Sequence, residues 1–216
     1  MPEGPEIHAQ AQRLRRLLEG QRPGIECDWP PIRCQLTPLQ GQKVTRVRAQ
    51  GKAFLATFES GLTLYAHMQL YGRWKFVAKG VTPVSRRQLR LRLSGPAQDA
   101  LLYSATDVHL LTPQQLERQP YLARLGPDLL DPEQPDEVFW ARLEHPSWCG
   151  RQLAGLLLDQ SFWAGPGNYL RSEILFCAGL EPQIRPRDLN ERQKGRLIQV
   201  ARVLSYRSQA SGGLTN

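Results

Sequence analysis

The sequence predicts an α+β fold in which an N-terminal antiparallel β-sandwich, carrying one helix, precedes an all-helical domain. The spacing of apolar residues is helical at the start of the chain, changes to short β-rich runs between about residues 44 and 111, and becomes helical again after Pro113. Sharp turns separate the β-rich runs, which is typical of antiparallel sheets. With 216 residues the chain can form two small domains that each bury a core. We expect the β-sandwich domain at residues 1–125 and the helical domain at residues 126–216.

The N-terminal domain is expected to contain one helix and six strands. An amphipathic helix is predicted over residues 5–19, because Pro5 suits a first helical turn and Gly20 suits a helix end. Turn signals at Ser60-Gly61 and Ser94-Gly95-Pro96 separate β-rich runs. In chain order these runs are VTRVRA, AFLATFE, LTLYAHM, RWKFVA, RQLRLRL and ALLYSA.

The second domain is expected to be helical. A proline-rich stretch, LGPDLLDPEQPDE, predicts a hinge near residues 125–135. Helical spacing after Pro113 predicts helices at about 114–119, 136–145, 151–163, 169–178 and 188–206.

The composition favours a protein with a polyanionic partner. The net charge is +8, and only five of the 28 basic residues are lysines; the arginines suit bidentate phosphate contacts. Charge alone leaves open a basic protein that is merely soluble. No apolar stretch of about 18 residues occurs, and no basic segment followed by an apolar one opens the chain. We therefore expect neither a membrane span nor a signal peptide, and a cytoplasmic location.

The four cysteines form no C-x-x-C pair, which argues against a zinc site. His145 and Cys149 stand one helical turn apart. They are either two neighbours on a helix, which we favour, or part of a metal site. No metal is therefore expected in this chain.

The chain begins MPEGPE, and a small second residue such as Pro2 permits removal of Met1. Removal would leave a secondary amine, and an α-amino group is less protonated at neutral pH than a lysine. Such an amine can attack an electrophilic carbon and form a cationic iminium. Glu3 stands beside it and can move protons, while Glu6 lies in a first helical turn that favours its charge. The alternative is that Pro2, Glu3 and Glu6 only start a helix.

Two further segments place unusual residues where a partner could cover them. In LLLDQSFWAGPGNYLRSEIL, at 156–175, glycines allow a close backbone approach to an anion, and Asn168 can cap the helix that follows. In HMQLYGRW, the residues QLY occupy a loop between predicted strands, an odd place to expose Leu and Tyr. Lys52 follows Gly51 before a strand. The ordinary alternatives are a helical hairpin with a capping Asn168, a core-facing strand end and a solvated lysine.

These motifs occur together and in this order, and as a set they resemble the Fpg/Nei family of bifunctional DNA glycosylases, most closely its endonuclease VIII branch. The resemblance covers essentially the whole chain. It implies base-excision repair of double-stranded DNA: a damaged base is removed through a Schiff base on Pro2, and AP lyase activity then cleaves the strand by β,δ-elimination. Gly4 and the QLY triplet favour oxidised pyrimidines over oxidised purines as substrates.

The resemblance also assigns roles to single residues. Glu3 is implied to be the proton donor, Glu6 to support it, and Lys52 to contact phosphate and to donate a proton in β-elimination. The QLY triplet is implied to fill the space left by an everted nucleotide, and the 156–175 segment to form a helix-two-turn-helix motif. The residues implied to contact DNA are Gln69, Leu70, Tyr71, Arg124 and Asn168.

Members of this family usually continue into a four-cysteine zinc finger, a pattern that does not occur in these 216 residues. We therefore expect no zinc and no other cofactor in this chain. This leaves open a non-catalytic binder of damaged DNA as an alternative. A structural basic protein of the translation apparatus would explain the charge but neither QLY nor Pro2. We expect a monomer that is cytoplasmic and nucleoid-associated.

Overall fold

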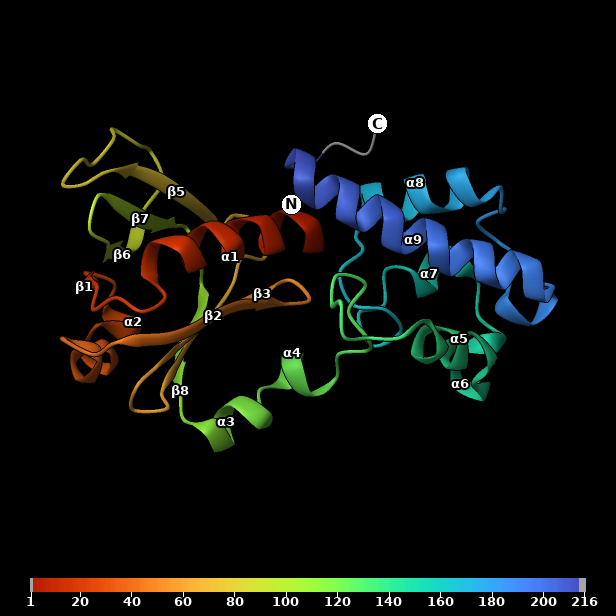
Figure 1. Ribbon diagram of the computed structural model, residues 1–216, viewed down its shortest axis with the longest axis horizontal. Coiled ribbons are helices and arrows are strands. Elements are labelled where there is room, and N and C mark those ends of the chain that lie inside the picture. The colour runs from red at the N-terminus through yellow and green to blue at the C-terminus, as the bar shows by residue number, and fades with distance from the viewer. Residues whose placement is uncertain (1, 214–216) are drawn as a thin grey trace. The chain divides into compact units, whose positions relative to one another are not determined.

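The computed structural model describes residues 2–213 (Figure 1). Two compact units divide the chain: residues 10–119 with Pro2 form the first, and residues 3–9 with the chain from Pro120 onward form the second. The predicted α+β architecture is confirmed, because the first unit contains two four-stranded antiparallel sheets and the second is helical. The domain boundary at residue 125 stays a prediction.

The two sheets have the strand orders β1-β6-β7-β5 and β2-β3-β4-β8. All six predicted runs form strands, with ends within two residues of those predicted. Two further strands, β1 and β8, were not predicted; β1 has only three residues, which is too short for an alternating pattern. The strands are β1 (Gly24–Glu26), β2 (Val44–Gln50), β3 (Ala53–Phe58), β4 (Thr63–His67), β5 (Arg73–Ala78), β6 (Leu89–Ser94), β7 (Gln98–Tyr103) and β8 (Asp107–Leu111).

The predicted N-terminal helix is confirmed as α1 (Gly4–Leu18). Its second half buries Leu14 and Leu18 within the first unit, and the chain then turns at Gly20, whose φ is +84°. Glycine adopts this left-handed conformation without strain, which explains why the helix ends there. The remaining helical elements of this unit are α2 (Pro30–Arg33), η1 (Cys34–Leu39) and α3 (Pro113–Glu117).

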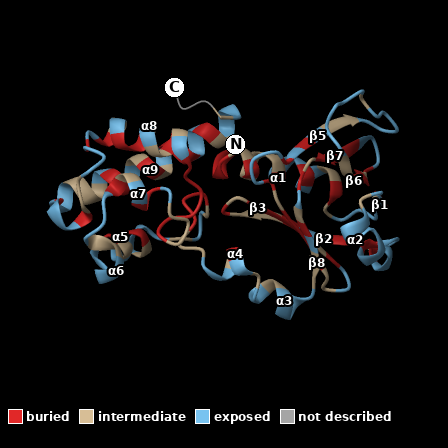
Figure 2. Cartoon of the chain, turned by 180° about the vertical axis from the view of Figure 1, so that it is seen from behind, coloured by how far each residue is buried: buried red, intermediate tan, exposed pale blue. Residues whose placement is uncertain are grey.

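The second unit is built around α8 and α9, which pack against each other (Figure 1). Its core holds the fully buried rings of Phe139, Phe162 and Trp163, and Figure 2 shows the buried stretches that α8 and α9 contribute. Glycines in the left-handed region, Gly179 and Gly212, end these two helices. The helices are α4 (Pro120–Ala123), α5 (Asp136–Glu144), α6 (Pro146–Cys149), α7 (Leu153–Leu156), α8 (Asn168–Ala178), η2 (Pro186–Asp188) and α9 (Glu191–Ser211).

The predicted helix at 151–163 is wrong, since only α7 is helical there. Asp159 competes with the helix: its carboxylate accepts hydrogen bonds from the backbone N–H of Ser161 at 3.0 Å and from the Ser161 hydroxyl at 2.6 Å. The carbonyl of Gln160 then accepts from the N–H of Gly126 at 2.9 Å. These bonds lead the chain out of the helix toward the turn before α8.

Candidate active site

Glu3 is buried at the start of α1, with 3% of its surface exposed. Its carboxylate accepts hydrogen bonds from the backbone N–H groups of Gly167 at 2.6 Å, Tyr169 at 3.0 Å and Leu170 at 3.3 Å. These are the N–H groups that the first turn of α8 leaves without intrahelical partners. The positive end of the α8 dipole also stabilises the negative charge of the carboxylate. Glu3 therefore caps α8 from a position more than 160 residues away in the sequence.

The prediction that Asn168 caps this helix is wrong. Gly167 is the N-cap residue and Asn168 is the first helical residue, because Glu3 already occupies the place where a capping side chain would lie. The side chain of Asn168 is exposed at the start of α8. Its position leaves it available to a ligand, and its role as a phosphate ligand stays a prediction.

Glycines bring the start of the chain close to the turn before α8. The N–H of Gly4 donates to the carbonyl of Gly165 at 2.9 Å, and a Cβ added to Gly4 would lie 2.6 Å from the Gly165 Cα. A Cβ on Gly167 would lie 2.4 Å from the carboxyl carbon of Glu3. These glycines are needed because the backbone approaches too closely for a side chain. Gly4 makes room for the backbone of Gly165, and Gly167 makes room for the Glu3 side chain.

Glu6 links the start of α1 to two hydroxyl groups. One carboxylate oxygen accepts from the Glu3 N–H at 2.7 Å, and the other accepts from the Tyr169 hydroxyl at 2.7 Å. The Tyr169 hydroxyl also lies 2.8 Å from the Ser208 hydroxyl. Burial raises the pKa of the Tyr169 phenol well above its usual value, and the neighbouring Glu6 adds to the rise. Tyr169 therefore remains a donor to Glu6 at neutral pH.

Tyr169 and Ser208 were not identified from the sequence. Tyr169 stands next to Asn168 in a motif already singled out, so its position was a usable signal. Ser208 lies on α9 and has no sequence feature that connects it to the start of the chain. Only the packing of α8 against α9 brings it to Tyr169.

Pro2 is half-buried and directly precedes Glu3, and it belongs to the first unit. Lys52 lies in the same unit, in a two-residue turn between β2 and β3. Gly51 provides the left-handed conformation that this turn needs, with a φ of +57°. The turn holds Lys52 in a half-buried position.

The QLY triplet lies in the loop between β4 and β5 and points away from the core. Leu70 and Tyr71 are 63% and 69% exposed, so the alternative of a core-facing strand end is wrong for both. Gln69 has a φ of +49°, and its side-chain carbonyl accepts from the Thr106 hydroxyl at 2.9 Å. Arg87 donates to the Tyr71 carbonyl at 2.7 Å. The loop backbone is thus held in place while two large side chains are presented to solvent.

Arg124 is exposed and follows α4 directly; its guanidinium lies 6.0 Å from the centre of the Tyr121 ring. His145 is the N-cap of α6, where its ring accepts from the Ser147 N–H at 3.1 Å. Within residues 2–213, no group of three or more His, Cys, Asp or Glu side chains could hold a metal ion. No helix in that part of the chain is long and apolar enough to cross a membrane.

Two family models match this chain, which folds into a β-sandwich unit followed by a helical unit. The model of the formamidopyrimidine-DNA glycosylase N-terminal domain matches residues 1–109, and that of the formamidopyrimidine-DNA glycosylase H2TH domain matches residues 125–213. The chain belongs to this family of base-excision DNA glycosylases with AP lyase activity.

Relatives and solved structures agree with this assignment. Endonuclease 8 of Salmonella paratyphi B is 48% identical over 89% of this chain and 74% of its own. Endonuclease 8 of Escherichia coli O17:K52:H18 is 44% identical over 99% of this chain and 81% of its own. The solved complex of Lactococcus lactis Fpg with DNA containing an abasic site has a TM-score of 0.82 at 20% identity, over 98% of this chain and 81% of that one. That likeness confirms the fold.

Proposed function

We propose that this DNA glycosylase excises oxidised pyrimidines, using the amine of Pro2 as its nucleophile, and then cleaves the strand by β,δ-elimination. The observation that carries the proposal is the seating of Glu3 on the N-terminus of α8, because it fixes the residue next to Pro2. The 44–48% identity to Endonuclease 8 proteins supports the choice of substrate.

In the proposed reaction the nitrogen of Pro2 attacks C1′ of the damaged nucleotide. A C–N bond forms, the glycosidic bond breaks, and the base leaves with a proton. The sugar ring then opens: the C1′–O4′ bond breaks, O4′ takes a proton, and C1′ forms an iminium with the Pro2 nitrogen. This iminium draws electrons from the C2′–H bond, so that loss of the 2′ proton expels the 3′ phosphate. A second elimination expels the 5′ phosphate. Glu3 can accept the proton that the amine loses and deliver it to the sugar oxygen or to the departing base.

The supporting roles of the other site residues are part of the same proposal. Glu6 holds the Glu3 N–H and thereby the turn that carries Pro2. The half-buried Lys52 contacts a phosphate and donates a proton in β-elimination. The exposed Leu70 and Tyr71, with Gln69, replace the everted nucleotide in the base stack. Arg124 and Asn168, both exposed, contact the DNA backbone. The enzyme would act as a monomer in the cytoplasm, at the nucleoid.

The substrate choice is tested by comparing duplexes that carry either thymine glycol or 8-oxoguanine. We expect single-turnover excision of thymine glycol to be faster by about tenfold or more, since a pocket that suits one base discriminates against another by this order. An intact duplex of the same sequence is the control for nonspecific cleavage. A preference for 8-oxoguanine would overturn the assignment to oxidised pyrimidines.

The position of Glu3 is tested by Gly167→Ala. The backbone angles at Gly167, φ −130° and ψ −152°, suit alanine, so the substitution acts through the new methyl group, which would overlap the Glu3 carboxylate. We expect excision to slow by about 10²-fold, the lower range for loss of a general acid or base, in a protein that still folds. Gly155→Ala is the matched control, because a Cβ there meets nothing within 4 Å. Equal excision rates in both variants would show that excision does not need the Glu3 carboxylate to be held at the N-terminus of α8.

A further inference from the structure

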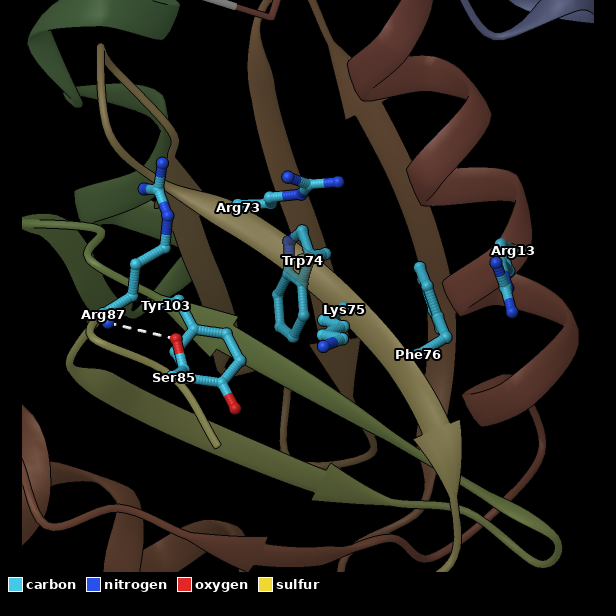
Figure 3. A pocket seen from close by; sticks show the side chains of 8 residues that line it. All are labelled: Arg13, Arg73, Trp74, Lys75, Phe76, Ser85, Arg87 and Tyr103. Atoms are coloured by element: carbon cyan, nitrogen blue, oxygen red, sulfur yellow. Dashed lines mark hydrogen bonds between the residues drawn. The ribbon is translucent and has the colours of Figure 1, made fainter. Parts of the chain in front are cut away.

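A pocket of about 410 Å³ lies alongside β5 in the first unit (Figure 3). It is lined from α1, from β5, from the loop before β6 and from the end of β7. Four of its residues are basic and none is acidic. The lining residues are Arg13, Arg73, Trp74, Lys75, Phe76, Ser85, Arg87 and Tyr103.

Two buried donors line this pocket without partners. Trp74 and Tyr103 are each only 4% exposed. Among the described residues, neither the Trp74 indole nitrogen nor the Tyr103 hydroxyl makes a hydrogen bond. Buried polar groups are normally paired, and an unpaired one points to a missing partner. Trp74 faces the other side of β5 from Arg73 and Lys75, and its ring packs against Phe54. The Tyr103 hydroxyl is therefore the donor that shares a face with Arg73 and Lys75.

The surrounding charges indicate which acceptor fits. Arg13, Arg73, Lys75 and Arg87 are exposed and bring four positive charges to one pocket. Arginine side chains form paired hydrogen bonds with phosphate oxygens. The pocket volume falls within the range of small-ligand sites, about 300–1,000 Å³. A phosphate-bearing group therefore matches the positive charges, and the Tyr103 hydroxyl belongs to the residue paired with Arg73 on the same face of the sheet.

Arg87 connects this pocket to the loop that carries the QLY triplet. Its backbone N–H donates to the Ser85 hydroxyl at 3.0 Å (Figure 3). Its guanidinium donates to the Tyr71 carbonyl at 2.7 Å. A ligand in the pocket would thus lie next to a loop already proposed to enter DNA. This proximity favours a phosphate of the DNA backbone over a free nucleotide.

We propose that this pocket binds a backbone phosphate of the DNA and so fixes the first unit on the strand beside the QLY loop. The site goes beyond the proposed function, since none of its residues takes part in the chemistry at Pro2 and Glu3. Its contribution is to affinity, and it places Arg13, Arg73, Lys75 and Tyr103 among the DNA-contacting residues.

The test compares the double variant Arg73→Ala/Lys75→Ala with the control Arg16→Ala/Arg46→Ala, which removes the same charge from exposed positions outside the pocket. Arg87 is left unchanged because it also holds Tyr71. With a duplex that carries a non-cleavable abasic-site analogue, we expect the pocket variant to lose about tenfold in affinity and its salt slope to fall by about 1 for each lost phosphate contact. The single-turnover rate at saturating enzyme should not change, which separates failure of this site from failure of the chemistry.

A second variant tests whether a loss of binding could be caused by misfolding. Tyr103→Phe removes only the unpaired hydroxyl, so it should fold with an unchanged or higher Tm and still bind the duplex less tightly. A parallel calorimetric titration uses inorganic phosphate and a deoxynucleoside monophosphate. Binding of either to the wild type and not to the pocket variant, with equal DNA affinities, would assign the pocket to a free phosphate compound and overturn the DNA proposal. Equal behaviour of pocket and control variants in every titration would overturn the site itself.

Discussion

Blocking the amine of Pro2 is expected to abolish covalent trapping of the enzyme on DNA. When Met1 is retained, or when a tag precedes Pro2, the nitrogen of Pro2 belongs to a peptide bond and its lone pair is delocalised into the carbonyl group. Such a nitrogen cannot attack C1′. Borohydride reduces the iminium that the free amine forms, so the mature chain should give a protein–DNA adduct on abasic duplex and the blocked chain none.

The mass of the mature chain and a removable tag complete this experiment. The mass reports whether Met1 is absent, and cleavage of the tag directly before Pro2 should restore the adduct. An adduct that persists with Pro2 blocked would assign the nucleophile to a lysine, with Lys52 the first to be tested. Failure of a folded protein with a free Pro2 to give any adduct would favour a protein that binds damaged DNA without reacting.

The sequence predicted the architecture well because hydrophobic period depends on local spacing. The six β-rich runs and α1 follow from residues that are close in the chain, and the structure confirms them. The segment after α7 could not be predicted in the same way. Its apolar spacing is helical, but Asp159 and the bond between Gly126 and Gln160 redirect it. A long-range bond such as the one between Gly126 and Gln160 leaves no periodic signal.

The residues of the candidate site could be predicted from the sequence, but the hydrogen bonds between them could not. Glu3 and Asn168 were both identified, but the two residues lie more than 160 positions apart in the sequence, and nothing in either motif indicates that Glu3 replaces Asn168 as the cap. The glycines before α8 were interpreted as making room for a phosphate, and the structure uses Gly167 to make room for a carboxylate. The same backbone conformation suits a phosphate and a carboxylate, because it presents unpaired N–H groups to an anion.

Glu3 contributes to the N-terminal turns of both α1 and α8, and both contacts bear on the effect of substituting it. Its carbonyl accepts the N–H of Ile7 at 3.2 Å in the first turn of α1, and its carboxylate caps α8. The amide of a glutamine would keep one acceptor and turn an NH2 group toward the remaining N–H donors. Glu3→Gln therefore removes both the charge that the α8 dipole stabilises and the ability to move a proton.

We expect Glu3→Gln to slow excision of an oxidised base by about 10²–10⁴-fold, the range for loss of a general acid or base. Cleavage of a preformed abasic site should fall less, because no base has to leave with a proton. Single-turnover rates on the two substrates measure the difference. Glu117→Gln, at an exposed position in α3, is the control for the change in charge.

The ratio of the two rates shows at which step Glu3 acts. A loss confined to excision places the proton transfer of Glu3 at the departure of the base. An equal loss on both substrates, with borohydride trapping also weakened, would mean that Glu3 acts earlier by positioning the Pro2 amine. In that case Gly167→Ala should reproduce the equal loss, since its methyl group displaces the same carboxylate without removing it.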